Sequence, residues 1–266
     1  MQEREVQFLK ENGLDADGID REELLAAFAD EMEAGLAGRP SSLMMIPSFI
    51  SIDRPVKTGT PVVVLDAGGT NLRAAVVSID DKGHAQIGSF SKRAMPGTQG
   101  TLSAEDFFDA FAEFLMPIIA ESESIGFCFS YPAEITPDCD ARLIRWSKQI
   151  EVPTVVGQMI GSGLLRHLAQ RGYERRVVIL NDTVATLLAG KSAGVAKPYS
   201  AYVGFILGTG TNTAYVERND RITKRTDLDP SGSMVINIES GAFRGARQSV
   251  FDATMDAQTI DPGHYT

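Results

Sequence analysis

Cysteine and histidine are scarce in this chain of 266 residues, which contains two cysteines and three histidines. Cys128 and Cys139 do not have metal-ligand spacing, so we expect reduced thiols rather than a disulfide framework or a metal site. The histidines, His84, His167 and His264, lie outside every motif described below. A hydrolase triad therefore has no support in the sequence.

Long apolar runs and an excess of basic residues are also missing. No stretch approaches the roughly 20 apolar residues of a membrane helix, and the opening Met-Gln-Glu-Arg-Glu does not have the pattern of a signal peptide. The net charge of -10 argues against binding to nucleic acid or to an anionic membrane. We therefore expect a cytoplasmic protein whose partners are small molecules, with homo-oligomerisation left open. Backbone amides can still build a local site for an anion such as ATP.

Apolar runs of strand length alternate with helical patterns along the chain. Strands are expected at 62–65, 74–79, 84–91, 125–129, 177–180, 201–207 and 234–239, with 213–217 pairing with 222–226. Helices are expected from an N-cap at Asp20, after Ser103, at 155–171 and at 183–189. The first helix should bury one face made of Leu24, Leu25, Phe28, Met32 and Leu36. This order indicates an α/β architecture, in which ligands gather at the carboxyl ends of strands.

A glycine-rich octet follows the strand at 62–65. Its polar and glycine residues are Asp66, Gly68, Gly69, Thr70, Asn71 and Arg73. Two glycines let the backbone approach a phosphate and point N–H groups at it. Asp66 at the strand end suits Mg²⁺, usually through water. A tight hairpin turn is the alternative for the glycines alone, but the whole octet favours phosphate binding. It is not a Walker A loop, because no Gly-Lys-[Ser/Thr] follows.

Two further strand ends carry candidate residues. Asn181 and Asp182 end the strand at 177–180 and precede a helix, so Asp182 is a candidate general base. On that segment alone, the commoner role of such an aspartate is to cap the helix. The turn Gly208-Thr209-Gly210, followed by Asn212, could bind the other side of a triphosphate. It is a weak signal, because many hairpins contain Gly-x-Gly, and it lacks the third glycine of a dinucleotide site.

Two segments set polar residues beside aromatic ones, as in a sugar pocket. They are Phe129-Ser130-Tyr131-Pro132 and Trp146-Ser147-Lys148. A strand-end turn and a solvated lysine are the alternative interpretation of these segments. The phenylalanines at 107–114 and the pair Met44-Met45 are expected in the core.

Taken together and in this order, these segments resemble the hexokinase family of the actin-like ATPase superfamily. The resemblance covers nearly the whole chain from about Glu31 and includes 237–243, which is similar to a segment with a sugar-binding glutamate, Glu239. It implies an actin-like (ribonuclease H-like) two-domain sugar kinase with a cleft. Residues 61–180 would form the small domain, and residues 1–56 and 183–266 part of the large one.

The resemblance also implies a reaction, the phosphorylation of a glucose-like hexose to its 6-phosphate by ATP and Mg²⁺, the first step of glycolysis. Asp182 would accept the hydroxyl proton, and Lys148 would act beside it. Asp66 would hold Mg²⁺, in most cases through water. The sugar would contact Ser130, Ser147, Lys148, Asn181, Asp182, Asn212 and Glu239. The nucleotide would contact Asp66, Gly68, Gly69, Thr70, Asn71, Arg73, Gly208, Thr209 and Gly210.

The sequence departs from the family pattern at several places. Ser147 stands where the family usually has Thr, Tyr131 where it has Phe, and Ser240 where it has Trp. The family continues beyond the segment that resembles 261–266, so we expect the second domain to be truncated here. A hexose-binding sensor without catalysis is therefore an alternative function. A filament-forming actin-like ATPase would leave the two sugar-type segments unexplained.

Overall fold

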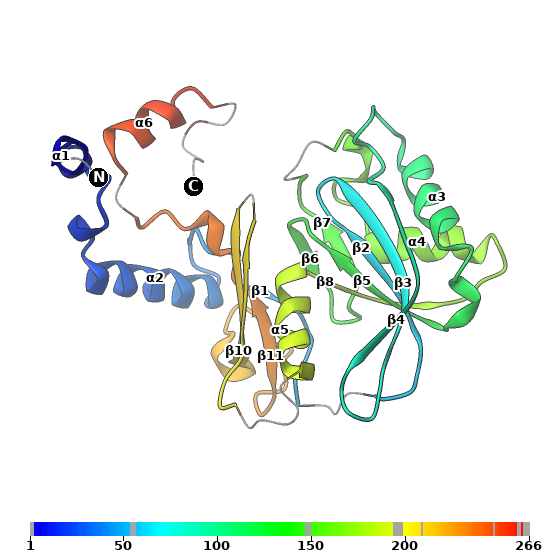
Figure 1. Cartoon of the computed structure of the whole chain (residues 1–266). Coiled ribbons are helices and arrows are strands. Elements are labelled where there is room, and N and C mark those ends of the chain that lie inside the picture. Colours follow the sequence, from blue (N-terminus) through cyan, green and yellow to red (C-terminus); the bar gives the residue numbers. More distant parts are fainter. Residues whose placement is uncertain are drawn as a thin grey trace.

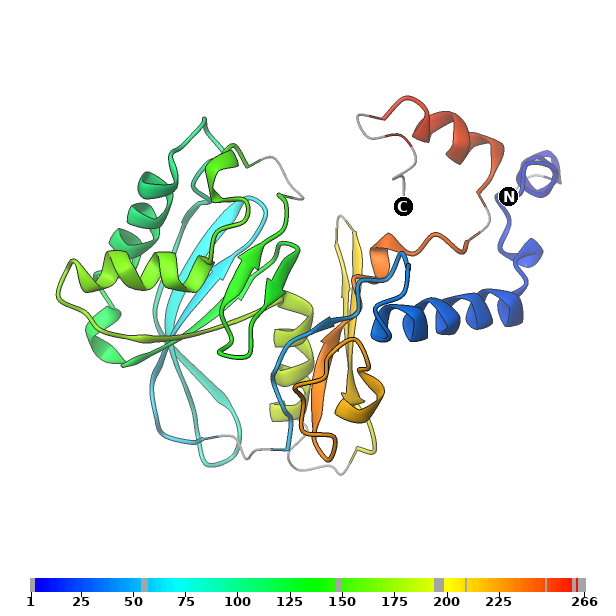
Figure 2. The same ribbon diagram turned by 180° about the vertical axis from the view of Figure 1, so that it is seen from behind.

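A five-stranded and a four-stranded β-sheet organise the chain, beside a small two-stranded one, and the two larger sheets lie side by side with one helix between them in both views (Figures 1 and 2). The computed structural model describes residues 3–53, 57–146, 150–193, 199–208, 210–246, 248–259 and 262. The strands are β1 (Ile46–Pro47), β2 (Val62–Ala67), β3 (Asn71–Ile79), β4 (Ala85–Ala94), β5 (Ser124–Phe129), β6 (Ala133–Ile135), β7 (Ala141–Leu143), β8 (Arg176–Leu180), β9 (Val203–Leu207), β10 (Thr211–Arg218) and β11 (Ser233–Asn237).

Helices connect the strands and cover the sheets. The α-helices are α1 (Glu3–Glu11), α2 (Arg21–Leu36), α3 (Ala104–Leu115), α4 (Ile160–Ala169), α5 (Asp182–Ala193) and α6 (Val250–Asp256). Short 3₁₀ turns occur at Ala16–Gly18, Ile119–Glu121, Pro153–Val155, Asn219–Arg221 and Ser240–Ala242. In the described part of the chain, no helix is both long and apolar enough to cross a membrane.

The first sheet has five strands in the order β4-β3-β2-β5-β8. β2, β5 and β8 run parallel, β3 pairs antiparallel with β2, and β4 pairs antiparallel with β3. Helix α3 begins at the N-cap Ser103, whose side chain accepts a hydrogen bond from the amide of Asp106. Its phenylalanines Phe107, Phe108 and Phe111 are fully buried in the core of this sheet. The three parallel strands therefore present their carboxyl ends at one edge of a rigid layer.

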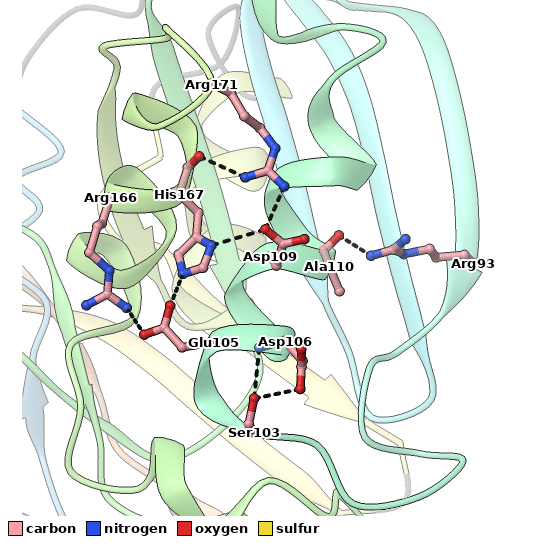
Figure 3. Close-up of polar contacts among 9 residues, drawn as sticks. All are labelled: Arg93, Ser103, Glu105, Asp106, Asp109, Ala110, Arg166, His167 and Arg171. Atoms are coloured by element: carbon pink, nitrogen blue, oxygen red, sulfur yellow. Dashed lines mark hydrogen bonds and ion pairs between the residues drawn. The ribbon is translucent and has the colours of Figure 1, made fainter.

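Helix α4 packs directly on α3, and a chain of polar contacts ties the two helices together (Figure 3). The buried His167 of α4 places its two ring nitrogens 3.1 Å from a carboxylate oxygen of Glu105 and 3.3 Å from one of Asp109. Arg166 pairs with Glu105, and Arg171 pairs with Asp109. The hydrogen bond from Arg171 lowers the pKa of Asp109. His167, which belongs to no sequence motif, therefore has a structural role on the back of the sheet.

The second sheet has the order β1-β11-β10-β9, and its inner strands are covered on both faces, while Val203, Phe205 and Leu207 of β9 are exposed. Helix α5 packs on one face, where Val184 and Leu187 meet Ala214 and Val235. On the other face, α2 and the segment after it bury a separate cluster, made of Leu36, Leu43, Met45, Ile222, Met234, Ile236 and Ile238. Helix α5 thus joins the end of the first sheet to the second sheet.

The expected pairing of 213–217 with 222–226 is wrong. The structure pairs β10 with β9 and β11 instead. Ile222 ends a 3₁₀ turn and is fully buried, and the amide of Lys224 donates to the carbonyl oxygen of Leu36 at the end of α2. The segment is therefore held by α2 rather than by a strand, which the local apolar pattern could not reveal.

Two helix expectations also need correction. Leu25, expected on the buried face of α2, is 69% exposed, because this helix packs on the second sheet only through residues from Phe28 to Leu36. The helix expected at 155–171 is shorter: a 3₁₀ turn ends at Val155, and α4 begins only at Ile160. Gly157 lies between them with a φ of 83°, a left-handed conformation that interrupts a helix.

Candidate active site

The candidate residues meet at the carboxyl ends of the parallel strands. The register places Asp66 of β2 beside Cys128 of β5, and Cys128 beside Leu180 of β8. Ser130 and Asp182 come two residues after these positions, so the three strand ends bring Asp66, Ser130 and Asp182 to one edge. Burial raises the pKa of the Cys128 thiol, and the charges of Asp66 and Asp182 raise it further. Both carboxylates therefore lie close enough to the Cys128 thiol to influence it.

These residues enclose a polar cavity of about 310 Å³. Its lining is Asp66, Gly68, Gly69, Thr70, Asn71, Arg73, Ser130 and Asp182. All six residues singled out in the glycine-rich octet are thus brought together with the candidate base and with a residue of the first sugar-type segment. Such a concave site with a few convergent polar groups is the usual form of a ligand pocket.

The glycine-rich octet is both a hairpin turn and a wall of this cavity. The amide of Gly68 donates to the carbonyl oxygen of Asn71 at 3.0 Å, which closes the β2–β3 hairpin. Arg73 reaches back across the hairpin, and its Nη1 lies 2.5 Å from Oδ2 of Asp66. The octet therefore does form a tight hairpin turn, as the alternative interpretation expected. This turn also lines the cavity, so the hairpin is compatible with binding an anion.

Asn181, and not Asp182, caps helix α5. The side-chain oxygen of Asn181 accepts a hydrogen bond from the amide of Thr183 at 2.8 Å. This bond satisfies one of the unpaired N–H groups at the start of the helix. The carboxylate of Asp182 is left facing the cavity, with the hydroxyl of Thr183 at 3.4 Å. The capping role that the sequence offered as the commoner explanation belongs to the neighbouring residue.

A cluster of amides surrounds Glu239, which follows β11. Oε1 of Glu239 accepts hydrogen bonds from Nδ2 of Asn237 at 2.7 Å and of Asn212 at 3.4 Å. Asn212 also donates to Asn237 at 2.9 Å and to Asn181 at 3.4 Å. Burial raises the pKa of Glu239, and the charge of Asp182 raises it further. Three of the predicted sugar-binding residues, Asn181, Asn212 and Glu239, therefore lie in one hydrogen-bonded network. Through Asn181, this network reaches the start of helix α5.

Asn237 belongs to this network but was not among the predicted site residues. It is buried and is the last residue of β11. Glu239 follows two positions later, beyond the strand and in a left-handed conformation with a φ of 58°. The contact between the two side chains therefore depends on the turn after β11, which the sequence pattern does not show.

The remaining candidates fall elsewhere. Ser147, Lys148 and Thr209 lie outside the described residues. Gly208 and Gly210 form the turn between β9 and β10, in which the amide of Gly208 donates to the carbonyl of Gly210 at 2.8 Å. They are not among the described residues that line the 310 Å³ cavity. The second turn is thus connected to the site through Asn212, which follows it on β10.

Comparison with known proteins identifies relatives over most of the chain. Two family models, both described as Hexokinase, match residues 7–192 and 202–266. Hexokinase-1 of Oryza sativa subsp. japonica is 34% identical over 264 residues, covering 92% of this chain and 52% of that protein. Hexokinase-2 of Solanum tuberosum is 34% identical over 254 residues, covering 89% of this chain and 50% of that protein. The chain spans about half the length of the curated relatives it matches.

Solved structures show the same likeness. A hexokinase from Schistosoma mansoni complexed with glucose superposes with a TM-score of 0.72 at 28% identity, covering 92% of this chain and 57% of that one. A crystal structure of another hexokinase gives a TM-score of 0.67 at 25% identity, over 92% of this chain and 56% of that one. The predicted α/β fold of the actin-like sugar kinases is confirmed.

Proposed function

Because the chain belongs to the hexokinase family, we propose that it carries the phosphoryl-transfer site of an enzyme that phosphorylates a hexose. The substrate is a glucose-like sugar, the donor is ATP, and the product is the hexose 6-phosphate that enters glycolysis in the cytoplasm. The observation that carries the proposal is the single cavity that joins the glycine-rich turn at 68–71 to Ser130 and Asp182. A phosphate site and a proton acceptor are the two parts that this transfer needs.

Asp182 acts as the general base. The oxygen of the sugar hydroxyl forms a bond to the terminal phosphorus of ATP, while the bond from that phosphorus to the bridging oxygen of ADP breaks. The hydroxyl proton passes to the carboxylate of Asp182. Little else is needed covalently, because positioning and charge neutralisation supply most of the catalysis in phosphoryl transfer. Lys148 is proposed to act beside Asp182 at the transferred group.

The nucleotide phosphates lie against the glycine-rich turn. The amides of Gly69 and Thr70 donate to phosphate oxygens, with Asn71 and Arg73 alongside, and the turn 208–210 closes the other side. The amide of Gly68, predicted for the same role, already donates to the carbonyl oxygen of Asn71 within the hairpin, so Gly68 contributes as part of the cavity wall. Arg73 forms an ion pair with Asp66, so both charged groups are held at the wall of the cavity. The two lobes, formed by 61–180 and by 1–56 with 183–266, would close over the ligands and exclude water, which competes as an acceptor.

The cavity fits Mg²⁺ as the partner of ATP. Asp66 lines it with carboxylate oxygens, and the described residues contain no cluster of three or more histidines, cysteines and acidic residues that could chelate a metal alone. Mg²⁺ is usually held by one or two carboxylates, waters and the phosphates of the substrate, so a single aspartate suffices. When bound, the ion neutralises charge on the phosphates. Asp66 would hold it, in most cases through water.

The sugar occupies the side of the site formed by the amide cluster. Asn181, Asn212 and Glu239 present oxygen and nitrogen atoms within one hydrogen-bonded network, and Ser130 lies on the wall of the cavity. Ser147 and Lys148 are proposed to complete the hexose site. Sugar hydroxyls both donate and accept, and a mixed set of amides and a carboxylate matches that chemistry.

A coupled assay for hexose 6-phosphate tests the proposal in the full-length native protein. We expect turnover that requires glucose, ATP and Mg²⁺ together and that is lost in Asp182→Asn, which keeps the side-chain size but cannot take the proton. Asp81→Asn is the matched control, because it makes the same exchange at an exposed turn residue that does not line the cavity. No turnover in the native protein, or full activity in Asp182→Asn, would remove the proposed role.

A hexose-binding sensor is the second candidate function. The observation that favours it is that Gly208 and Gly210 are not among the described residues lining the cavity with the first turn, whereas the amide cluster around Glu239 is fully connected. Calorimetry separates the two functions. A sensor binds glucose and does not bind Mg·ATP, while a kinase binds both.

A further inference from the structure

Tyr131 connects the two halves of the proposed site. It directly follows Ser130 at the end of β5 and is 2% exposed. Its hydroxyl donates a hydrogen bond of 2.7 Å to the carbonyl oxygen of Gly68, 63 residues earlier in the chain. The segment that faces the sugar is thus tied by one side chain to the turn that faces the phosphates. The resemblance assigned Tyr131 no role.

The ring of Tyr131 is held from two sides, which fixes the place of its hydroxyl. Trp146 packs edge-on against it with ring centroids 4.8 Å apart, and Phe129 packs at 4.9 Å. Trp146 is itself anchored, because its Nε1 donates to the carbonyl of Val152 at 2.9 Å. A ring confined in this way cannot swing its hydroxyl away from Gly68 without disturbing the aromatic cluster.

The carbonyl that accepts this hydrogen bond belongs to the peptide group between Gly68 and Gly69. The carbonyl of Gly68 and the N–H of Gly69 belong to one trans peptide group, so they point in opposite directions. With glycine on both sides, this plane could rotate at little steric cost. Tyr131 binds the carbonyl from the core side, and both glycines line the cavity. The N–H of Gly69 is thereby turned away from Tyr131.

We propose that the Tyr131 hydroxyl is a positioning group that fixes the Gly68–Gly69 peptide plane and so aims the Gly69 N–H at the phosphates of the donor. The inference rests on the proposed function and adds to it a residue that acts through the backbone. Burial raises the pKa of Tyr131, and the charge of Asp66 raises it further, so the phenol keeps the proton that it donates. Without the hydroxyl, the plane samples orientations that present a carbonyl oxygen to an anion.

Tyr131→Phe tests the inference, because it removes the hydroxyl and keeps the ring. Tyr215→Phe is the matched control: its hydroxyl is also largely buried and donates to Glu217 at 2.8 Å, on β10 and outside the cavity. One hydrogen bond is worth about 0.5–1.5 kcal/mol. We therefore expect Tyr131→Phe to weaken Mg·ATP binding and to lower kcat/KM for ATP by about 2- to 13-fold, with the affinity for glucose unchanged.

Two measurements keep this inference separate from the proposed function. Calorimetry gives the affinities for Mg·ATP and for glucose, and the coupled assay gives turnover. Native protein that binds Mg·ATP without making sugar phosphate would refute the proposed reaction but leave the positioning role measurable. Equal Mg·ATP affinity in Tyr131→Phe and the native protein, or an equal loss in Tyr215→Phe, would overturn the positioning role. A loss of glucose affinity as large as that for ATP would also overturn it, since a general distortion would move both.

Discussion

Replacing Glu239 with glutamine separates its charge from its hydrogen bonds. Both amides that contact this side chain, those of Asn237 and Asn212, donate to the same oxygen, Oε1. A glutamine that places its carbonyl oxygen there keeps both bonds and loses only the negative charge. The variant should therefore fold into the same network, and its effects on binding should report the carboxylate itself.

The expected loss of sugar affinity follows from the hydrogen bonds that a carboxylate makes. Bonds to a charged acceptor contribute about 1.5–3 kcal/mol. Losing one such bond to a sugar hydroxyl at Glu239 corresponds to a roughly 10- to 150-fold weaker affinity for glucose. Mg·ATP affinity should stay within about 2-fold, because Glu239 is not among the residues that line the cavity around the glycine-rich turn.

Glu239→Gln should weaken glucose binding but raise the free energy of unfolding, and the size of this gain depends on pH. Burial and the charge of Asp182 raise the pKa of Glu239, so the folded state binds its proton more tightly than the unfolded state does. The stability gained from this proton is fully present below the unfolded pKa and is lost as pH rises through the raised pKa. Glu239→Gln does not titrate, so it should be more stable than the native protein at neutral pH, and the difference should shrink toward pH 4.

Calorimetry with glucose and urea unfolding at several pH values measure both effects. The reasoning predicts weaker glucose binding together with a higher urea midpoint at neutral pH. Unchanged glucose affinity would show that Glu239 does not hold the sugar. A lower midpoint at neutral pH would show that the charge stabilises the fold, contrary to the direction of its pKa.

Three further predictions concern the base and the packing. Asp182→Ala should lower kcat by about 10²- to 10⁴-fold while calorimetry still detects glucose binding; full activity would exclude Asp182 as the base. Lys224 donates to both carbonyls of 44–45, so Lys224→Met should cost about 1–3 kcal/mol by urea unfolding, and an unchanged midpoint would contradict this. A Cβ on Gly163 would lie 2.4 Å from the Phe108 ring, so Gly163→Ala should destabilise the fold by about 1–3 kcal/mol in the same assay. Equal stability would show that α3 and α4 can adjust to the added methyl group without loss of packing.

The sequence predicted the elements whose signal is local. The apolar run before Asp66 forms β2, the residues after Ser103 form α3, and the residues before Asn181 form β8, as predicted. Each has a cap or a turn residue beside a regular apolar pattern, and local chemistry decides such elements. The convergence of the strand ends could also be expected, because parallel strands share one edge.

Contacts between distant segments could not be predicted in this way. Ile222 reads as the start of a strand, but its burial against α2 is decided by tertiary packing. The bond from Tyr131 to Gly68 and the place of Asn237 beside Glu239 depend on side-chain directions that the sequence pattern does not contain. The role of Asn181 as the cap of α5 was likewise hidden, because Asp182 is an equally good capping residue.

The most direct test of the proposed site is a crystal structure of the full-length native protein with glucose and a nonhydrolysable ATP analogue. The account predicts the terminal phosphate against the amides of Gly69 and Thr70, and a sugar hydroxyl hydrogen-bonded to Asp182 in line with the terminal phosphorus. Glucose bound away from Asp182, or phosphates bound away from the glycine-rich turn, would contradict it.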